Sequence, residues 1–182
     1  FEVKMGLRTM DQYMDGAKRP GHFDGVLLVV ARLFNIVLPT NAYFGKKDFQ
    51  QLSILQALAR ELFFPLNIVP CDIVREADGL AMSSRNRYLD PEERQQALYL
   101  SRCLRAVDAR ARAGMKAQPL TEIATEMLAA YPLIRLEYLE VRKSRDLSLV
   151  ETLRAEDEPV ALIAAFCGKT RLIDNLVLCL GQ

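Results

Sequence analysis

The order of hydrophobic patterns in the first part of the chain constrains the fold more than any other feature. Two stretches with apolar residues at helical spacing alternate with two short apolar runs of strand character; in chain order these segments are residues 23–34, 36–44, 48–64 and 66–75. Gly45 breaks the first run, and Pro65 ends the second helical stretch. Helix, strand, glycine turn, helix and strand is the order typical of an α/β domain with a parallel sheet. About half of such a sheet is present, so we expect the chain to begin partway through a domain.

The pattern changes in the second part of the chain. Asp90 and Pro91, followed by two glutamates, form a strong helix start with Asp90 as the N-cap. Two helical and three strand-like segments follow, at residues 91–113, 120–130, 136–141, 159–166 and 171–180. Gly168 lies in a hairpin-like turn between the last two strands. The chain therefore divides into an α/β and an α+β domain, which we place at residues 1–76 and 77–182 with the boundary between 74 and 86.

Charge and composition exclude several classes of protein. The 182 residues carry a net charge of +1, so no overall field attracts nucleic acid or an anionic membrane. The longest apolar run, Val160–Cys167, falls far short of the roughly 20 residues that cross a bilayer. The four cysteines have no zinc or disulfide spacing, and the single histidine excludes a metal site built on a histidine cluster. We expect buried cysteines in a cytoplasmic protein whose partners are small molecules.

The segment Phe44–Gln51 is the first of two that indicate chemistry. It lies at a strand-to-helix turn, where open α/β sheets bind their ligands. Gly45 permits close approach of a ligand to the backbone, and Lys46 and Lys47 place cations beside the positive end of a helix dipole. The same residues also fit a solvated lysine pair before Asp48, which we expect to cap the helix through its side chain. Spacing alone leaves both interpretations open.

The second segment is Ala77–Asn86, which contains a glycine turn followed by Ser83, Ser84 and Arg85. The two hydroxyls can each donate a hydrogen bond to a phosphate oxygen, and the guanidinium can donate a charged fork. The alternative is a helix-capping or linker loop between the two domains. Neither segment decides the function by itself.

Taken together, five stretches resemble the pantoate–β-alanine ligase family. They extend over nearly the whole chain, at residues 19–26, 29–35, 44–52, 78–89 and 170–175. The resemblance implies the C-terminal part of a Rossmann-like nucleotidyltransferase domain, followed by a small α+β domain of helices and a three-stranded antiparallel sheet. Members of the family use ATP and Mg²⁺ to join pantoate to β-alanine through a pantoyl adenylate, releasing pyrophosphate and AMP. The resemblance also implies a homodimer that binds small molecules, and neither nucleic acid nor a membrane.

The resemblance assigns roles by matching position. The residues that it implies for ATP binding are Gly45, Lys46, Lys47, Asp48, Val74, Met82, Ser83, Ser84 and Arg85. Negative charge on the phosphates needs fixed cations and donors. The catalytic residues implied are therefore Lys47, Ser83, Ser84 and Arg85. Pantoate binding is assigned to Gln51 and to an apolar wall of Val26, Val29 and Val30. Arg19 and His22 match positions near that pocket, although His22 also fits a structural histidine at a helix start.

Two departures from the family pattern bear on function. Lys46 stands where the family usually carries an acidic or amide residue. The family's first ATP signature, with a Met-Gly loop and a His-x-Gly-His helix start, is absent from these 182 residues. We therefore expect this polypeptide by itself to be inactive; the alternative function is a non-catalytic module that packs on a separate N-terminal partner. Another adenylate-forming enzyme, such as a tRNA synthetase, is disfavoured by the near-neutral charge.

Overall fold

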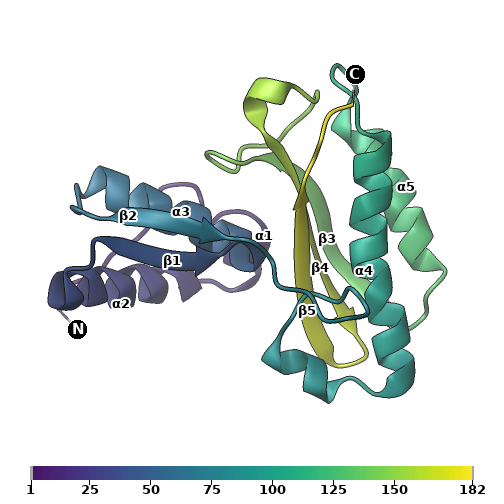
Figure 1. Ribbon diagram of the computed structural model, residues 1–182, viewed down its shortest axis with the longest axis horizontal. Coiled ribbons are helices and arrows are strands. Elements are labelled where there is room, and N and C mark those ends of the chain that lie inside the picture. Colours follow the sequence, from purple (N-terminus) through teal and green to yellow (C-terminus); the bar gives the residue numbers. More distant parts are fainter. Residues whose placement is uncertain (1, 182) are drawn as a thin grey trace. The chain divides into compact units, whose positions relative to one another are not determined.

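The computed structural model describes residues 2–181, which form two compact units that divide between Asp72 and Ile73. This division lies just before the window of 74–86 in which the sequence analysis places the boundary. Each unit has its own hydrophobic core. Figure 1 shows a parallel pair of strands in the first unit and an antiparallel sheet in the second. The expected α/β class, with a parallel and a three-stranded antiparallel sheet, is therefore confirmed.

The first unit combines three helices with the parallel pair of strands. Its elements are α1 (Met14–Lys18), α2 (His22–Val37), β1 (Asn41–Gly45), a 3₁₀ turn η1 (Lys46–Asp48), α3 (Phe49–Glu61) and β2 (Asn67–Cys71). The pairing of β1 with β2 runs from Asn41 beside Asn67 to Gly45 beside Cys71. This register brings the carboxyl ends of both strands to one edge, which is where α/β sheets bind ligands.

Helices α2 and α3 pack on one face of this sheet. Ala42, Phe44 and Ile68 contact the core that the two helices form. In that core the rings of Phe34 and Phe44 meet edge to face, with their centroids 6.4 Å apart. Tyr43 alternates to the opposite face and is 67% exposed. Because parallel sheets are normally covered on both faces, this exposed face is unusual for a complete α/β domain.

The end of α2 differs from the sequence prediction. Ile36 and Val37 belong to the last turn of the helix rather than to a strand. The helix closes at Leu38, which has a left-handed φ of 50° and donates its N–H to the carbonyl oxygen of Phe34 at 2.9 Å. The strand then begins only at Asn41.

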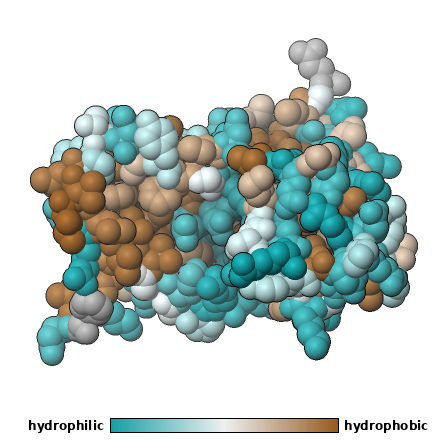
Figure 2. Space-filling view, turned by 60° about the horizontal axis from the view of Figure 1, so that its bottom comes forward, coloured by the Kyte–Doolittle hydropathy of each residue, from teal (hydrophilic) through white to brown (hydrophobic). Residues whose placement is uncertain are grey.

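Several large apolar side chains of the first unit are exposed. They lie on α2, at its C-terminal end and after α3, and they are Val29, Leu33, Ile36, Val37, Leu38, Leu62 and Phe63. Figure 2 shows a broad hydrophobic area over this unit. No helix among residues 2–181 is long and apolar enough to cross a membrane. An extended apolar surface is uncommon on a soluble monomer and more often marks a protein contact.

The second unit contains two long helices and the antiparallel sheet. Its elements are a 3₁₀ helix η2 (Ser84–Tyr88), α4 (Pro91–Arg110), α5 (Ala117–Ala129), β3 (Ile134–Lys143), η3 (Ala155–Asp157), β4 (Pro159–Cys167) and β5 (Thr170–Val177). The strand order in the sheet is β3-β4-β5. Ala161, Ile163 and Ala165 of the central strand share one core with the buried sides of α4 and α5. The predicted order of two helices followed by three antiparallel strands is confirmed.

Two details of this unit differ from the sequence prediction. Helix α5 starts at Ala117, before the expected Leu120, and Thr121 donates to the carbonyl oxygen of Gln118 inside the helix. Residues 72–75 do not extend β2; within them Arg75 forms only an isolated bridge, to Ala81.

The start of α4 confirms the predicted cap. The side chain of Asp90 accepts from the backbone N–H groups of Glu92 and Glu93, and Glu93 Oε2 accepts from the N–H of Asp90 at 3.1 Å. The turn between β4 and β5 lies against this cap, because a Cβ atom on Gly168 would stand 1.7 Å from Glu93 Oε1. Gly168 also has a φ of +55°, which side chains disfavour.

We expect Gly168→Ala to lower the free energy of unfolding by about 2 kcal/mol, since the added methyl group strains the backbone and displaces the capping carboxylate of Glu93. Urea denaturation measures this change. Lys169→Ala changes an exposed residue of the same turn and is the control, with an expected change below about 0.5 kcal/mol. Equal stability of Gly168→Ala and the unchanged protein would contradict this reading of the turn.

The cysteines are only partly buried as expected. Cys103 and Cys167 are buried, and burial raises the pKa of each thiol to about 11. Cys71 is half-buried, whereas Cys179 is exposed. The expectation of buried cysteines is therefore wrong for Cys179, which lies after the last strand.

Candidate active site

The turn between β1 and α3 places two lysines at the carboxyl edge of the parallel sheet. Lys46, Lys47 and Asp48 form the 3₁₀ turn η1, which connects β1 directly to α3. Gly45 is exposed, and a Cβ atom there would meet no other atom within 4 Å. A ligand can therefore approach the backbone beside the start of α3. Helix starts of this kind favour phosphate and other anions.

Lys46 is paired across the end of the sheet. Its Nζ atom donates to Asp72 Oδ1 at 2.6 Å, one residue beyond the end of β2. The hydrogen bond and the charge of Lys46 lower the pKa of the Asp72 carboxyl. A phosphate that contacts Lys46 would therefore compete with Asp72. The assignment of Lys46 to ATP stays a prediction.

Asp48 stands at the N-cap position of α3 but does not cap it as expected. Its carboxylate accepts no hydrogen bond from the first turn of the helix, and the side chain is exposed. The physical reason is the preceding 3₁₀ turn, which gives Asp48 a φ of −89° and a ψ of 63° instead of the extended backbone of a capping aspartate. The capping prediction is wrong, and the carboxylate is left at the surface.

Gln50 is a buried polar residue that the sequence analysis missed. Its Nε2 atom donates to the carbonyl oxygens of Met10 and Tyr13, at 2.7 and 3.0 Å. Its Oε1 atom accepts from the N–H of Asp15 at 3.0 Å. Gln50 thus fixes the segment around α1 against the start of α3. The available signal was the pair of adjacent glutamines, since neighbouring positions of a helix face different directions.

An open pocket of about 420 Å³ is lined by α2 and α3, and its lining residues are His22, Gly25, Val26, Val29, Val30 and Gln51. Five of these recur at spacings of three and four residues along one side of α2, and Gln51 comes from the first turn of α3. The structure therefore brings together all four residues that the sequence analysis assigns to pantoate. An apolar wall beside a single amide suits a small molecule with an apolar body and a polar end.

His22 also lines this pocket, at the first position of α2. Its ring lies 5.0 Å from the ring of Phe23. Burial, and then the charge of Arg19, lowers the pKa of His22 below its ordinary value of 6.5. His22 is therefore an uncharged imidazole at neutral pH, with one nitrogen that donates and one that accepts. Arg19 is exposed and is not among the lining residues.

In the second unit, two residues assigned to ATP lie side by side. The N–H of Met82 donates to the carbonyl oxygen of Val74 at 2.9 Å, next to the bridge between Arg75 and Ala81. The side chains of Val74 and Met82 are both exposed. The structure places Val74 after the division at Asp72, although the sequence analysis counts it with the first domain.

The remaining assigned residues begin the 3₁₀ helix η2. Ser83 Oγ accepts from the N–H of Arg85 at 3.2 Å and so caps this short helix. The side chains of Ser84 and Arg85 are exposed. The capping interpretation thus holds for Ser83, while the hydroxyl of Ser84 and the guanidinium of Arg85 lie at the surface of the second unit.

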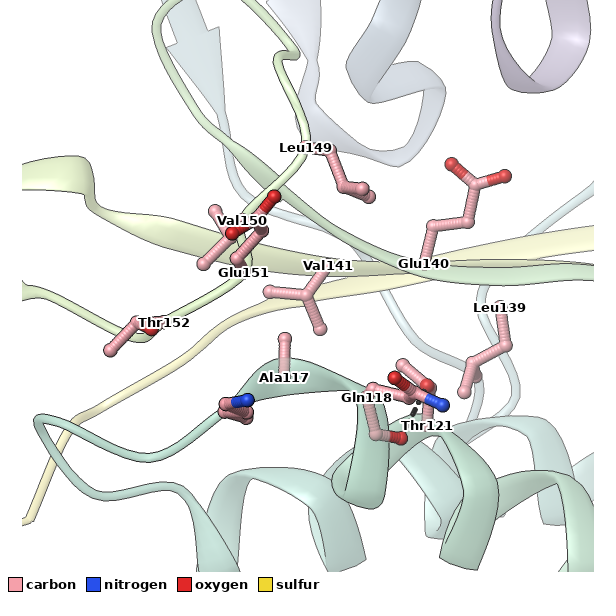
Figure 3. Close-up of a pocket in the computed structure, with 11 residues that line it drawn as sticks. Ala117, Gln118, Thr121, Leu139, Glu140, Val141, Leu149, Val150, Glu151 and Thr152 are labelled. Atoms are coloured by element: carbon pink, nitrogen blue, oxygen red, sulfur yellow. Dashed lines mark hydrogen bonds between the residues drawn. The ribbon is translucent and has the colours of Figure 1, made fainter.

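A larger pocket of about 470 Å³ in the second unit contains none of the assigned residues. Figure 3 shows it beside the first turn of α5, the strand β3 and residues 149–152. Leu139, Val141 and Val150 contribute its apolar part. The hydroxyl of Thr121 donates a hydrogen bond to the carbonyl oxygen of Gln118 within α5. Lys116, at the N-cap position of α5, also lines this pocket, but because none of the residues assigned to ATP or pantoate does, we assign the pocket no part in the site.

Among residues 2–181, no group of three or more His, Cys, Asp or Glu side chains is placed to hold a metal ion. The described residues therefore do not fit a Mg²⁺ site built by the protein alone. An Mg²⁺ ion that accompanies ATP is held largely by phosphate oxygens and water, and it needs no such site.

A parallel sheet with a lysine turn at its carboxyl edge, next to a helix start, is typical of nucleotide-binding α/β proteins. The sequence model of one family, described as Pantoate-beta-alanine ligase, matches residues 1–177. The chain belongs to the pantoate–β-alanine ligase family.

Curated relatives agree with this placement. The pantothenate synthetase of Acidobacterium capsulatum is 51% identical over 166 residues, which are 91% of this chain and 55% of the relative. The pantothenate synthetase of Rubrobacter xylanophilus is 49% identical over 171 residues, which are 93% of this chain and 58% of the relative. The chain thus spans a little over half the length of these relatives.

Solved structures share the fold. The crystal structure of pantothenate synthetase from Thermus thermophilus superposes with a TM-score of 0.89 at 40% identity, covering 96% of this chain and 63% of that one. The pantoate-β-alanine ligase of Francisella tularensis, in complex with β-γ ATP and β-alanine, gives a TM-score of 0.70 at 28% identity over 96% of this chain and 58% of that one.

Proposed function

We propose that this chain supplies the pantoate pocket and two ATP-contacting segments of a pantoate–β-alanine ligase. The reaction condenses (R)-pantoate with β-alanine through pantoyl adenylate and releases pyrophosphate and AMP. The observation that carries this proposal is the pocket that gathers Gln51 with Val26, Val29 and Val30. The names of the relatives and the ATP and β-alanine bound in the Francisella protein support the choice of substrates.

The pocket matches pantoate in chemical terms. The two methyl groups of pantoate would pack on Val26, Val29 and Val30, which removes apolar surface from water. The amide of Gln51 has both donors and an acceptor for the hydroxyl and carboxylate oxygens. The neutral imidazole of His22 adds a second polar contact without an unpaired buried charge.

The first reaction step concerns the phosphates. A carboxylate oxygen of pantoate attacks the α-phosphorus of ATP, a P–O bond forms, and pyrophosphate leaves with the electron pair of the broken bond. Lys47 and the N-terminus of α3 would stabilise the negative charge of the triphosphate in this step. Lys47 is the catalytic residue that the proposal assigns to the first unit.

The second unit would contribute the other ATP contacts. Ser83, Ser84 and Arg85 supply hydroxyl and guanidinium donors, which suit phosphate oxygens. Val74 and Met82, which lie side by side and exposed, would pack on the adenine. In the second step the amine of β-alanine attacks the acyl carbon of the adenylate, loses a proton, and displaces AMP.

The alternative is a module without catalysis that only packs on a separate N-terminal polypeptide. The exposed apolar surface of the first unit is compatible with this alternative as well. Product formation separates the two. A fusion protein, in which the N-terminal part of the Acidobacterium capsulatum relative precedes this chain, should form pantothenate only when ATP, pantoate and β-alanine are all present. A folded fusion protein without product would favour the alternative. A homodimer and a cytoplasmic location stay predictions.

In the fusion protein, we expect Gln51→Ala to raise the KM for pantoate about tenfold, because a hydrogen bond to a charged substrate is lost. The KM for ATP should change by less than about twofold. Steady-state kinetics with each substrate varied in turn measures both values. Gln56→Ala removes another half-buried glutamine of α3 that does not line the pocket, and it is the matched control. An unchanged KM for pantoate in Gln51→Ala would refute the assignment of Gln51.

A further inference from the structure

A hairpin directly precedes Ser83, Ser84 and Arg85 in the chain. The N–H of Glu76 donates to the carbonyl oxygen of Leu80, and the N–H of Gly79 donates to that of Glu76, both at 2.8 Å. At its base, Arg75 forms a two-pronged ion pair with the buried Asp174 of β5, at 2.7 and 3.0 Å. The hairpin is therefore anchored to the antiparallel sheet on one side.

Arg94, in the first turns of α4, holds the hairpin from the other side. Its Nη2 atom donates to Glu76 Oε2 and to Asp78 Oδ2, each at 2.6 Å, and its Nε atom donates to Asp78 Oδ2 at 2.9 Å. The three side chains are between 28 and 32% exposed. One guanidinium thus joins two carboxylates that belong to the same turn.

Each carboxylate also accepts a hydrogen bond from the loop, Asp78 from the backbone and Glu76 from a side chain. Asp78 Oδ1 accepts from the N–H of Leu80 at 3.2 Å. Glu76 Oε1 accepts from Nδ2 of Asn86, which is only 6% exposed and which also donates to the carbonyl oxygen of Ala81 at 3.1 Å. Asn86 directly follows Arg85, so hydrogen bonds lead from Arg94 of α4 through Glu76 to the residue next to Arg85.

The charges in this set persist at neutral pH. Hydrogen bonds from Asn86 and then from Arg94 hold the pKa of Glu76 below its ordinary value. An isolated surface ion pair contributes little to stability. Here the two carboxylates also accept hydrogen bonds from the loop, so the loss of Arg94 is expected to alter loop geometry more than global stability.

We propose that Arg94 is a positioning residue of the ligase, which holds the end of the hairpin in the geometry that binds ATP. This inference rests on the proposed function and extends it to a residue outside the ATP-contacting segments. Arg94 acts through Glu76 and Asn86 on the neighbouring Arg85. A small displacement of a group that contacts the reacting atoms reduces the rate steeply, so an indirect residue of this kind has a measurable effect.

The test is a double-mutant cycle in the fusion protein, with ATP as the varied substrate. We expect Arg94→Gln to lower kcat/KM for ATP about tenfold and to leave the KM for pantoate within about twofold. In an Arg85→Ala background, Arg94→Gln should lower kcat/KM for ATP by less than about twofold, because the guanidinium that Arg94 positions is already absent. Arg110→Gln, on the same helix, is the control, since that side chain bonds to a carbonyl oxygen of its own helix.

Equal effects of Arg94→Gln in both backgrounds would overturn the proposal, because they would show that Arg94 does not act through Arg85. Hydrogen exchange of the 182-residue chain separates this outcome from a failure of the proposed function, since it needs no activity. In that experiment the amides of residues 77–86 should exchange faster in Arg94→Gln than in the unchanged chain, while those of α5 stay the same. Unchanged exchange in residues 77–86 would also overturn it.

Discussion

Replacement of Lys47 by alanine is expected to reduce pantoyl-adenylate formation by about 10²-fold or more. The lysine lies in the turn between β1 and α3, where the carboxyl edge of the parallel sheet meets the start of a helix. Its positive charge would stabilise the phosphates most as pyrophosphate leaves. The loss of Lys47 should therefore lower the rate of the first step. Pantoate-dependent exchange of labelled pyrophosphate into ATP, in the fusion protein, measures that step directly.

Two further variants make the Lys47 result specific. Lys18→Ala removes an exposed lysine from the last turn of α1 and should leave the exchange rate unchanged. Lys46→Ala should have a smaller effect than Lys47→Ala, because the proposal assigns the catalytic contact with the triphosphate to Lys47. The fold should survive in all three, since η1 contains no buried residue and Lys18 of α1 is exposed. A Lys47→Ala protein that exchanges at a nearly normal rate would eliminate the proposed role of Lys47.

The 182-residue chain by itself is expected to form no measurable pantothenate. Its parallel sheet has two strands, and Tyr43 leaves one face of that sheet exposed. The chain also spans only 55 to 63% of the length of the relatives and structures compared above. A triphosphate bound at η1 would therefore lack contacts that the longer relatives can provide from their remaining residues. Pantothenate measured by mass spectrometry, with the purity of the chain verified by intact mass, checks this expectation.

The matching control adds the N-terminal part of a longer relative. The N-terminal part of the Acidobacterium capsulatum relative, inactive by itself, should confer activity when fused to this chain. Pantothenate formed by the pure 182-residue chain at a rate near that of the fusion protein would contradict the expectation. In that case the two ATP-contacting segments would be sufficient for the reaction.

Much of the fold was predictable because its signals are local. The helical spacing of apolar residues in α2 and α3, and the Asp90-Pro91 start of α4, depend on neighbours in sequence. The errors occurred where a local pattern has two solutions. Ile36 and Val37 suit a strand and a helix end equally well by composition. In the structure they complete α2, which ends at the left-handed backbone of Leu38.

The site was predictable to the extent that it lies on one helix or one turn. Helical spacing alone places Val26, Val29 and Val30 on one side of α2. The position of Gln51 beside them depends on how α3 packs on α2. The partners of Lys46, Gln50 and Arg94 were not predictable. Each bonds to residues between 16 and 40 positions away, and only the folded chain determines which groups meet.

Transfer of oxygen from pantoate to AMP shows whether this chain takes part in adenylate formation. The fusion protein would be supplied with ATP, β-alanine and pantoate labelled with ¹⁸O in its carboxylate. If the chain carries the pantoate pocket and ATP contacts of an adenylate-forming ligase, pantothenate and AMP will form in equal amounts, and one ¹⁸O atom will appear in the phosphate of each AMP. Pantothenate accompanied by unlabelled AMP, or a folded fusion protein that forms neither product, would contradict the account.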